Sequence, residues 1–235
     1  MRAHRLHATN LAVGPREVHG HGAHYLGTVR RAVVGDFVEL FDGAQHTAQA
    51  TITSVQGGVV VLDVTEVTAH EHTGLVVHLA PALLKGDKLA NVVRPATELG
   101  VASIIPLITS RADVKVLSAN KRARLARIAE EASRQSERVH IPIVHEAAPL
   151  AQATLPGTVL VAHPGAAVPL LSAVRELGTQ EITLVTGPEG GLTDEEVAWL
   201  SAERGAIAVG LGATILRAET APVAALAALA LWNAT

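Results

Sequence analysis

Cysteine is absent from this chain of 235 residues, which excludes a disulfide framework, a thiolate nucleophile and a thiolate metal site. Aromatic side chains make up only 2% of the chain, too few for a protein that stacks successive bases on aromatic rings. The N-terminus lacks the apolar core of a signal peptide, and the most apolar stretch, residues 221–232, is too short to cross a bilayer. We expect a soluble, cytoplasmic protein that does not bind membranes.

Several catalytic motifs are missing as well. There is no G-x-x-x-x-G-K-[S/T] phosphate loop and no Gly-x-Ser-x-Gly elbow, so a nucleotide hydrolase and a serine hydrolase both lack their machinery. Residues 210–215 begin as G-x-G, but Ile215 takes the place of the third glycine of a dinucleotide fingerprint.

His19, His21 and His24 are close enough in sequence to share an ion. We expect no metal there, because the stretch is glycine-rich, hence flexible, and lacks acidic or cysteine neighbours.

Charge is distributed unevenly along the chain, although the net charge is only −3. Residues 111–138 carry eight basic and four acidic side chains, whereas residues 139–235 carry three basic and nine acidic ones. The basic segment is either a solvated helix face or a surface that faces polyphosphate. The side chains that we expect to contact phosphates are Arg30, Arg31, Arg111, Arg124, Arg127 and Arg138.

The hydrophobic pattern predicts two domains, over residues 1–74 and 75–235. Short β-branched runs separated by Asp-Gly and Gly-Gly turns predict a small antiparallel barrel, with strands at 37–41, 50–53 and 59–62. After residue 74 strands alternate with helices, which is typical of a parallel α/β sheet. Its strands are expected at 75–79, 103–107, 159–162, 182–186 and 206–209.

Three helices can be anticipated. Thr193 followed by Glu196 forms a capping-box pattern, and Ser118 can cap a helix whose apolar face includes Leu125 and Ala129. The last helix, 223–232, is apolar on every side. Such a helix must be covered all round, by its own domain or by a second subunit.

The two most informative segments are glycine-bearing loops, residues 186–192 and 211–221, which each follow a β-branched run and precede a helix. Glycine allows a tight turn and close approach to a ligand, and the following helix offers unpaired N–H groups. The pair of loops predicts a cofactor cradle. His163 ends another predicted strand at the same kind of sheet edge, where α/β proteins bind ligands, although a structural histidine in a strand-end turn is the commoner explanation.

Taken together, these segments resemble the RsmE family, bacterial 16S ribosomal RNA (uracil-N3)-methyltransferases of the SPOUT superfamily. The motifs that carry the resemblance are spread in order along most of the chain. They are Leu40-Phe41-Asp42-Gly43, Lys85-Gly86-Asp87-Lys88, Thr97-Glu98-Leu99-Gly100-Val101, Ser110-Arg111, Gln135-Ser136-x-Arg138, Gly187-Pro188-Glu189-Gly190-Gly191 and Ile215-Leu216-Arg217-x-Glu219-Thr220-Ala221.

The resemblance implies a PUA-like β-barrel followed by a SPOUT α/β methyltransferase domain with a trefoil knot, a homodimer, and 16S rRNA or the small ribosomal subunit as substrate. It also implies that the knot loops bind S-adenosylmethionine. The cofactor-binding residues it suggests are Ala162, His163, Pro164, Thr186, Gly187, Pro188, Gly190, Gly191, Leu211, Gly212, Ile215, Leu216, Arg217 and Thr220.

Methyl transfer to uridine N3 requires loss of the N3 proton and stabilisation of the uracil anion. We assign the second task to Arg217 and name Glu189 and Glu219 as alternative bases. A carboxylate beside a helix N-terminus often only satisfies backbone donors, so water or the RNA itself stays open as the base.

Three departures from the family pattern concern the RNA side more than the cofactor loops. Pro95, Arg134 and Thr214 stand where the family usually has lysine, glutamate and arginine. Pro95 removes a helical hydrogen bond and is expected to kink its helix. Two alternatives therefore remain: a SPOUT methyltransferase that modifies another RNA position or a ribose oxygen, and a non-catalytic rRNA-binding assembly factor.

Overall fold

The computed structural model describes residues 4–71 and 73–233, and the chain forms two compact units. Unit 1 comprises Met1–His72 together with Ser133–Ile141, and unit 2 comprises Thr73–Ala132 together with Pro142–Thr235. The expected domain boundary at residue 74 assigned all later residues to the second domain, whereas residues 133–141 belong to unit 1. Their place in unit 1 rests on tertiary contacts: Arg5 donates to the Ser133 carbonyl at 3.0 Å, and the Ile141 N–H donates to the Gly43 carbonyl at 2.9 Å.

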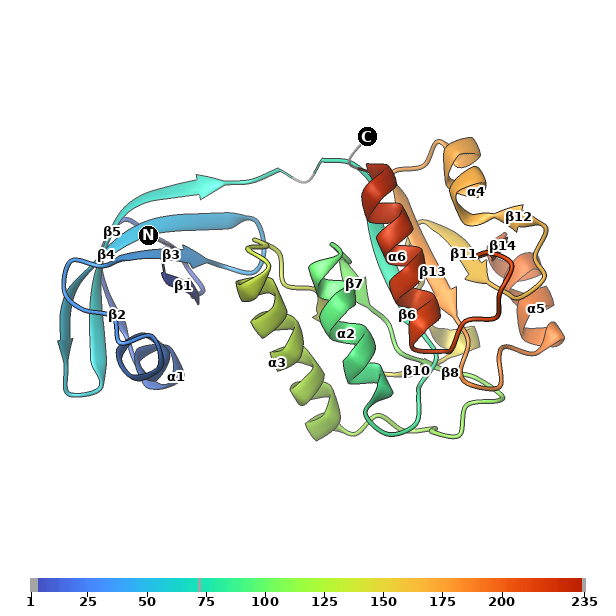
Figure 1. Cartoon of the computed structure of the whole chain (residues 1–235), viewed down its shortest axis with the longest axis horizontal. Coiled ribbons are helices and arrows are strands. Elements are labelled where there is room, and N and C mark those ends of the chain that lie inside the picture. The colour runs from blue at the N-terminus through green and yellow to red at the C-terminus, as the bar shows by residue number, and fades with distance from the viewer. Residues whose placement is uncertain (1–3, 72, 234–235) are drawn as a thin grey trace. The chain divides into compact units, whose positions relative to one another are not determined.

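Unit 1 is built on a five-stranded sheet in the order β1-β3-β4-β5-β2 (Figure 1). The long strands β4 and β5 form an antiparallel hairpin around the predicted Gly57-Gly58 turn. β1 pairs in parallel with β3, so the sheet is mixed, unlike the purely antiparallel barrel expected. The elements are β1 (His4–His7), β2 (Gly14–Val18), α1 (Gly20–His24), a π-helical turn η1 (Tyr25–Val29), β3 (Phe37–Phe41), β4 (His46–Gln56) and β5 (Val59–Ala69).

The inner face of this sheet carries the core of unit 1. Leu40, Ile52 and Leu62 are almost fully buried, and Leu26 of η1 packs with them. The glycine-rich segment that we expected to be flexible instead folds into α1. It can do so because Gly22 leaves room for the Val18 side chain, which would lie 2.8 Å from a Cβ at that position.

The turn after β3 depends on Asp42. Its Oδ1 accepts the backbone N–H groups of Ala44, Gln45 and His46 at 2.8 to 3.0 Å, and its Oδ2 lies 2.8 Å from His46 Nδ1. Burial raises the pKa of Asp42, but these hydrogen bonds outweigh it and lower the pKa to about 2.

We expect the Asp42→Asn variant to lose about 1–2 kcal/mol of folding free energy at neutral pH. The folded-state pKa of Asp42 is depressed, so the stabilisation is present above the unfolded value of 3.8 and is lost as the pH falls towards about 2. Urea denaturation at pH 7 and pH 3 measures this. An equal difference between variant and wild type at both pH values would contradict the prediction.

Unit 2 contains a seven-stranded sheet in the order β12-β14-β11-β13-β6-β7-β9, in which all neighbouring strands pair in parallel, as predicted. A separate parallel pair joins β10 to β8. The strands are β6 (Val76–Pro81), β7 (Ser103–Ile104), β8 (Leu107–Ile108), β9 (Ile143–Val144), β10 (Ala148–Pro149), β11 (Thr158–Ala162), β12 (Val168–Pro169), β13 (Glu181–Thr186) and β14 (Ile207–Gly210).

The prediction of one strand over 103–107 was wrong. The segment contains two short strands, β7 and β8, which belong to different sheets. Pro106 separates them and has no N–H for a sheet ladder, which explains why pairing is interrupted there.

The helices of unit 2 begin as the capping patterns indicate. In α5 the Thr193 side chain accepts the Glu196 N–H while the Glu196 side chain accepts the Thr193 N–H, a complete capping box. In α3 the Lys121 N–H donates to the Ser118 hydroxyl. The helices are α2 (Lys88–Glu98), α3 (Ala119–Gln135), whose residues from Ser133 on belong to unit 1, a 3₁₀ turn η2 (Leu150–Gln152), α4 (Leu170–Leu177), α5 (Asp194–Arg204) and α6 (Thr220–Asn233).

The final helix, α6, lies against β13 and beside α2 and α4 (Figure 1). Ala225, Leu226 and Leu229 are buried in this packing, whereas Leu231 is 74% exposed. The unit therefore covers only part of this apolar helix. We expected its own domain or a second subunit to cover this helix, and its own domain covers one side of it only.

Strand register places four loops together at one edge of the sheet. Thr186, the last residue of β13, pairs with Ala162 of β11 and with Pro81 of β6, and Ala162 also pairs with Val209 of β14. In a parallel sheet the carboxyl ends share an edge. The segments after β6, β11, β13 and β14 thus converge there.

Candidate functional site

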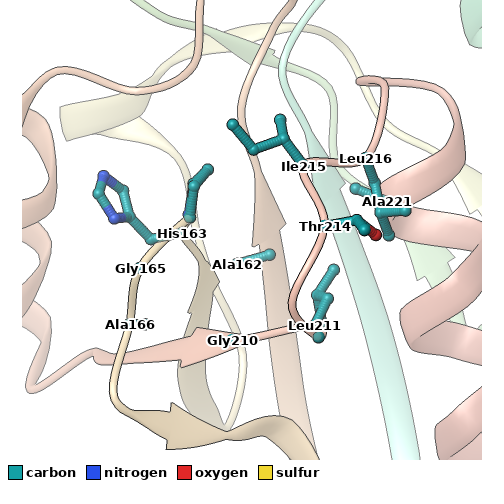
Figure 2. A pocket seen from close by; sticks show the side chains of 12 residues that line it. Ala162, His163, Gly165, Ala166, Gly210, Leu211, Thr214, Ile215, Leu216 and Ala221 are labelled. Atoms are coloured by element: carbon teal, nitrogen blue, oxygen red, sulfur yellow. The ribbon is translucent and has the colours of Figure 1, made fainter.

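A pocket of about 120 Å³, here called the small pocket, opens at this edge between the loops after β11 and β14. Figure 2 shows the segment from His163 to Ala166 opposite the loop that carries Leu211, Thr214 and Ile215. The lining is mostly backbone and small or aliphatic side chains: Ala162, His163, Pro164, Gly165, Ala166, Gly210, Leu211, Gly212, Thr214, Ile215, Leu216 and Ala221.

A larger cleft of about 630 Å³ shares several of these residues and extends to the loop after β13. We call it the charged cleft, because charged side chains from several segments line it. It is lined by Lys88, Arg111, Ala162, His163, Pro164, Gly187, Pro188, Glu189, Gly190, Gly191, Leu192, Ile215, Leu216, Arg217, Ala218, Glu219 and Ala221. Its volume is in the range of small-molecule sites.

One glycine is needed for the two loops of the small pocket to approach each other. A Cβ built on Gly210 would lie 2.9 Å from the carbonyl oxygen of Ala166, closer than real Cβ contacts allow. The His163 N–H, which donates to the Val209 carbonyl at 3.1 Å, fixes the same pair of segments. The distance between the two loops, and with it the shape of the small pocket, therefore requires glycine at position 210.

Five charged side chains line the charged cleft, and four of them, all except Arg111, interact with one another around Lys88. Lys88 Nζ lies 2.8 Å from Glu189 Oε1 and 3.7 Å from Glu219 Oε2, and Arg217 is close enough to lower the pKa of Lys88. The hydrogen bond that Lys88 donates to Glu189 outweighs this repulsion and raises the pKa of Lys88 overall. Burial raises the pKa of Glu189, yet the hydrogen bonds from Lys88 and the Lys85 N–H leave it below its ordinary value.

Arg111 supports the glycine loop after β13. Its guanidinium donates to the carbonyls of Gly190 and Leu192, both at 3.2 Å, and its side chain lies 3.2 Å from the position of a Gly190 Cβ. Arg111 therefore holds the rim of the charged cleft, a role that its assignment as a phosphate contact did not include.

Most of the predicted site residues line these two spaces. The proposed catalytic residues Glu189, Arg217 and Glu219 all line the charged cleft, and the predicted cofactor residues of the three loops line one pocket or both. Thr186 and Thr220 line neither the small pocket nor the charged cleft. Thr186 is buried at the end of β13, and Thr220 begins α6.

The predicted RNA-contacting arginines have different surroundings. Arg30, Arg31 and Arg127 are exposed, whereas Arg124 makes two contacts with the Asp87 carboxylate, at 2.6 and 3.4 Å. Burial lowers the pKa of Arg138 to about 10, because a desolvated guanidinium loses hydration. Arg138 is only partly exposed, and its assignment as a phosphate contact stays a prediction.

The structure shows where the three departures from the family pattern lie. Pro95 lies inside α2, which nevertheless continues to Glu98. The Arg134 guanidinium stacks over the Tyr25 ring at 4.2 Å within unit 1, and Thr214 lines the small pocket. Arg134 therefore has a packing role in unit 1.

The histidine cluster of α1 does have an acidic neighbour, contrary to expectation, since Glu17 lies 3.1 Å from His19. Within residues 4–71 and 73–233, no three His, Asp or Glu side chains come together as a metal site. Across the same described part of the chain, no helix is long and apolar enough to span a membrane.

Lys88 is the charged residue of the cleft for which the sequence predicted no role. It appeared only as the last residue of the Lys85-Gly86-Asp87-Lys88 motif, yet it contacts carboxylates 101 and 131 positions away. One signal in the sequence could have indicated this role. Lys88 begins a helix that follows a strand of the parallel sheet, and such a position lies near the edge where ligands bind.

Comparison with known proteins identifies both parts of the chain. The family model for the RNA methyltransferase domain matches residues 71–230, and that for the RNA methyltransferase PUA domain matches residues 19–64. A relative from Synechocystis sp. named ribosomal RNA small subunit methyltransferase E is 39% identical, over 87% of this chain and 69% of the relative. The relative of the same name from Rickettsia conorii is 32% identical, over 88% and 85%.

Solved structures agree with these matches. Ribosomal RNA small subunit methyltransferase E from Neisseria gonorrhoeae, bound to S-adenosyl methionine, superposes with a TM-score of 0.87 at 28% identity, over 98% of each chain. A putative methyltransferase from Legionella pneumophila with bound SAM gives 0.85 at 28% identity, over 99% of this chain and 98% of the other. The expected fold class, a SPOUT-type α/β methyltransferase domain after a PUA-like domain, is confirmed, while the knotted chain path stays a prediction. The chain belongs to the ribosomal RNA small subunit methyltransferase E family of RNA methyltransferases.

Proposed function

We propose that this enzyme transfers a methyl group from S-adenosylmethionine to N3 of a specific uridine in 16S rRNA of the small ribosomal subunit. The observation that carries the proposal is the charged cleft, where two glycine loops lie beside Arg217, Glu219, Glu189 and Lys88. Because the substrate is ribosomal RNA, we place the activity in the cytoplasm.

The small pocket and the adjoining cleft fit an adenosine-containing cofactor. Gly210 leaves the space that a Cβ would fill, so backbone groups of two loops can reach a ligand. Ile215 is 84% exposed, an unusual state for an aliphatic side chain that lines a pocket, and a flat base would cover it. When bound, S-adenosylmethionine supplies an electrophilic methyl group. The residues that we expect to hold it come from the loops after β11, β13 and β14, which in the family form the knot.

The charged residues then divide the remaining tasks. Arg217 can stabilise negative charge on the uracil ring as N3 loses its proton, an electrostatic effect that is strong in a site with little water. A carboxylate of the cleft, Glu189 or Glu219, can receive that proton. Because N3 lies on the Watson–Crick edge, the target uridine must be unpaired or flipped out of its helix.

The proposal is tested by incubating the purified protein and isotope-labelled S-adenosylmethionine with small subunits that lack the modification, followed by mass spectrometry of the nucleosides. We expect label in N3-methyluridine. Label in another base or in a ribose oxygen would show a SPOUT methyltransferase with a different target. Cofactor binding without transfer would favour a non-catalytic assembly factor.

For RNA contact we propose the exposed arginines of each unit. In unit 1, Arg30 and Arg31 precede the exposed apolar side chains of Val33, Val34 and Phe37, which are 61 to 67% exposed. In unit 2, Arg127 projects from α3, whose opposite face is buried. Positive charge beside uncovered apolar area suits RNA, which offers phosphates and base faces together.

Binding to ribosomal RNA should weaken as salt increases, because each neutralised phosphate releases counterions. If Arg30, Arg31 and Arg127 each contact one phosphate, they contribute about −2 to the slope of log K against log salt. Fluorescence anisotropy with a labelled RNA fragment between low and high salt measures the slope, and Arg127→Gln should make it less steep. Salt-independent binding would rule out the arginine surface.

A homodimer is the remaining part of the proposal. The exposed side of α6 carries Leu231 and Ala224, and Ile215 of the adjoining loop is also uncovered. The case for a partner surface rests on Leu231 and Ala224 alone, because a bound cofactor already accounts for the exposure of Ile215; exposed apolar side chains on a helix that is hydrophobic all round indicate such a surface. A second copy of the chain that packed its own α6 there would cover them by symmetry.

We expect Leu231→Asp to convert the dimer into a monomer, because it places a charge in the apolar contact. Sedimentation equilibrium gives the mass directly. Val116→Asp is the matched control, since Val116 is 72% exposed on a loop of the same unit, and it should leave the mass unchanged. A wild-type monomer, or a dimer that survives Leu231→Asp, would contradict the proposed contact.

A further inference from the structure

The two carboxylates of the charged cleft have different hydrogen-bond partners. Glu189 Oε1 accepts hydrogen bonds from Lys88 Nζ at 2.8 Å and from the Lys85 N–H at 3.3 Å. Glu219 Oε2 is buried and has no hydrogen-bond partner. Buried polar atoms are normally satisfied, so this oxygen stands out among the groups that line the cleft.

The usual structural explanation for a carboxylate at a helix start does not apply to this oxygen. Glu219 directly precedes the first residue of α6, Thr220, at the place from which a side chain would accept the N–H of the second or third helical residue. The second residue, Ala221, already donates its N–H to the Arg217 carbonyl at 2.9 Å. The third is Pro222, which has no N–H. Oε2 is therefore left for a donor from outside the helix.

Lys88 is the donor that could occupy it. Its Nζ lies 3.7 Å from Glu219 Oε2, just beyond hydrogen-bond distance, and the shorter contact with Glu189 holds it there. The other charged groups of the cleft are Arg217, on the same loop as Glu219, and Arg111, which is engaged with the Gly190 and Leu192 carbonyls. Among the described residues, Lys88 is the cation within 4 Å of Glu219 Oε2, so its position decides whether that oxygen stays available.

We propose that Glu219 accepts the uridine N3 proton, and that Glu189 is a positioning residue that keeps Lys88 from occupying the accepting oxygen. This inference rests on the proposed function and decides between the two bases that the sequence left open. In the step, Glu219 Oε2 receives the N3 proton while N3 takes the methyl carbon, whose former bonding pair remains on sulfur. Glu189, already paired, serves as the counterion of Lys88.

The arrangement predicts an unusual interaction between two substitutions. Removing the Glu189 carboxylate in Glu189→Met releases Lys88 to form a hydrogen bond with Glu219, which should slow single-turnover methyl transfer by about tenfold or more. Removing both partners, in the Lys88→Met/Glu189→Met double variant, frees Glu219 again. The double variant should therefore be faster than Glu189→Met alone.

Glu219→Gln supplies the second expectation. It should reduce the transfer rate by about a hundredfold to ten-thousandfold. The loss should shrink on small subunits whose RNA contains 5-fluorouridine, because its N3–H is more acidic and depends less on a base. The Glu189→Met rate should show the same trend more weakly. Lys85→Met is the matched control for the Lys88→Met substitution. It removes a lysine whose side chain is 73% exposed and lies outside the cleft lining, and it keeps the backbone N–H that donates to Glu189.

A crystal structure of Glu189→Met provides a readout that is independent of activity. We expect Lys88 Nζ within about 3.2 Å of Glu219 Oε2, compared with 3.7 Å here. Lys88 turned into solvent, a double variant no faster than Glu189→Met, or a Glu219→Gln enzyme at the wild-type rate would each overturn the inference. Failure of the wild-type enzyme to methylate uridine N3 in the same assay would instead reject the proposed function.

Discussion

Replacing Arg217 by glutamine should lower the rate of methyl transfer by about a hundredfold to a thousandfold, the usual effect of removing one preorganised donor that stabilises developing negative charge. Arg217 lines the charged cleft and is near enough to Lys88 to affect its pKa. Glutamine keeps a hydrogen-bond donor but loses the charge. The measurement is single-turnover transfer of labelled methyl to the small subunit, with saturating cofactor.

Arg175→Gln is the control, since Arg175 is exposed in the last turn of α4 and is not in the lining of either pocket. It should retain the wild-type rate. Cofactor affinity, measured by calorimetry, separates two roles for Arg217. A lower affinity with a wild-type rate at saturating cofactor would show that Arg217 binds the cofactor and does not stabilise the uracil anion. A wild-type rate together with a wild-type affinity would exclude both roles.

Gly210→Ala should weaken S-adenosylmethionine binding by about tenfold to a hundredfold. The added Cβ would lie 2.9 Å from the Ala166 carbonyl oxygen, a backbone atom that cannot turn aside. Overpacking of this kind costs about 1–3 kcal/mol. The two loops must separate, and this changes the small pocket between them. Calorimetric titration with S-adenosylmethionine measures the effect.

Gly27→Ala is the matched control for this substitution. A Cβ at Gly27 would meet only Val55, at an ordinary 3.7 Å, so cofactor binding should be unchanged. Thermal unfolding of both variants checks that the fold is retained. Unaltered affinity in Gly210→Ala would show that the cofactor does not depend on the close approach of these loops.

Local pattern was sufficient to locate much of the secondary structure. The strand expected at 37–41 is β3 with the same bounds, and the capping box of Thr193 and Glu196 is complete. Both depend on neighbouring residues alone. The strand expected at 50–53 is part of β4, which runs for 11 residues, because partners on both sides extend a strand into polar sequence that has no local preference for it.

Contacts between distant segments could not be anticipated in the same way. Residues 133–141 join unit 1 through hydrogen bonds to Arg5 and Gly43, and no local pattern encodes such a pairing. Arg111 and Arg138 looked equivalent as basic side chains. In the structure Arg111 holds a glycine loop, while Arg138 is desolvated enough to lower its pKa.

The sequence by itself determined the family, the order of the two domains, the parallel sheet and the residues of the glycine loops, because motifs and hydrophobic periodicity are properties of short segments. It also placed Glu189, Arg217 and Glu219 at one site, since the carboxyl ends of parallel strands share an edge. Only the tertiary structure decided how these groups are paired. The Lys88 ammonium lies beside two carboxylates from distant loops, and whether it bonds to one or to both depends on differences of about 1 Å. Such differences arise from the packing of the whole unit, which no local stretch of sequence specifies.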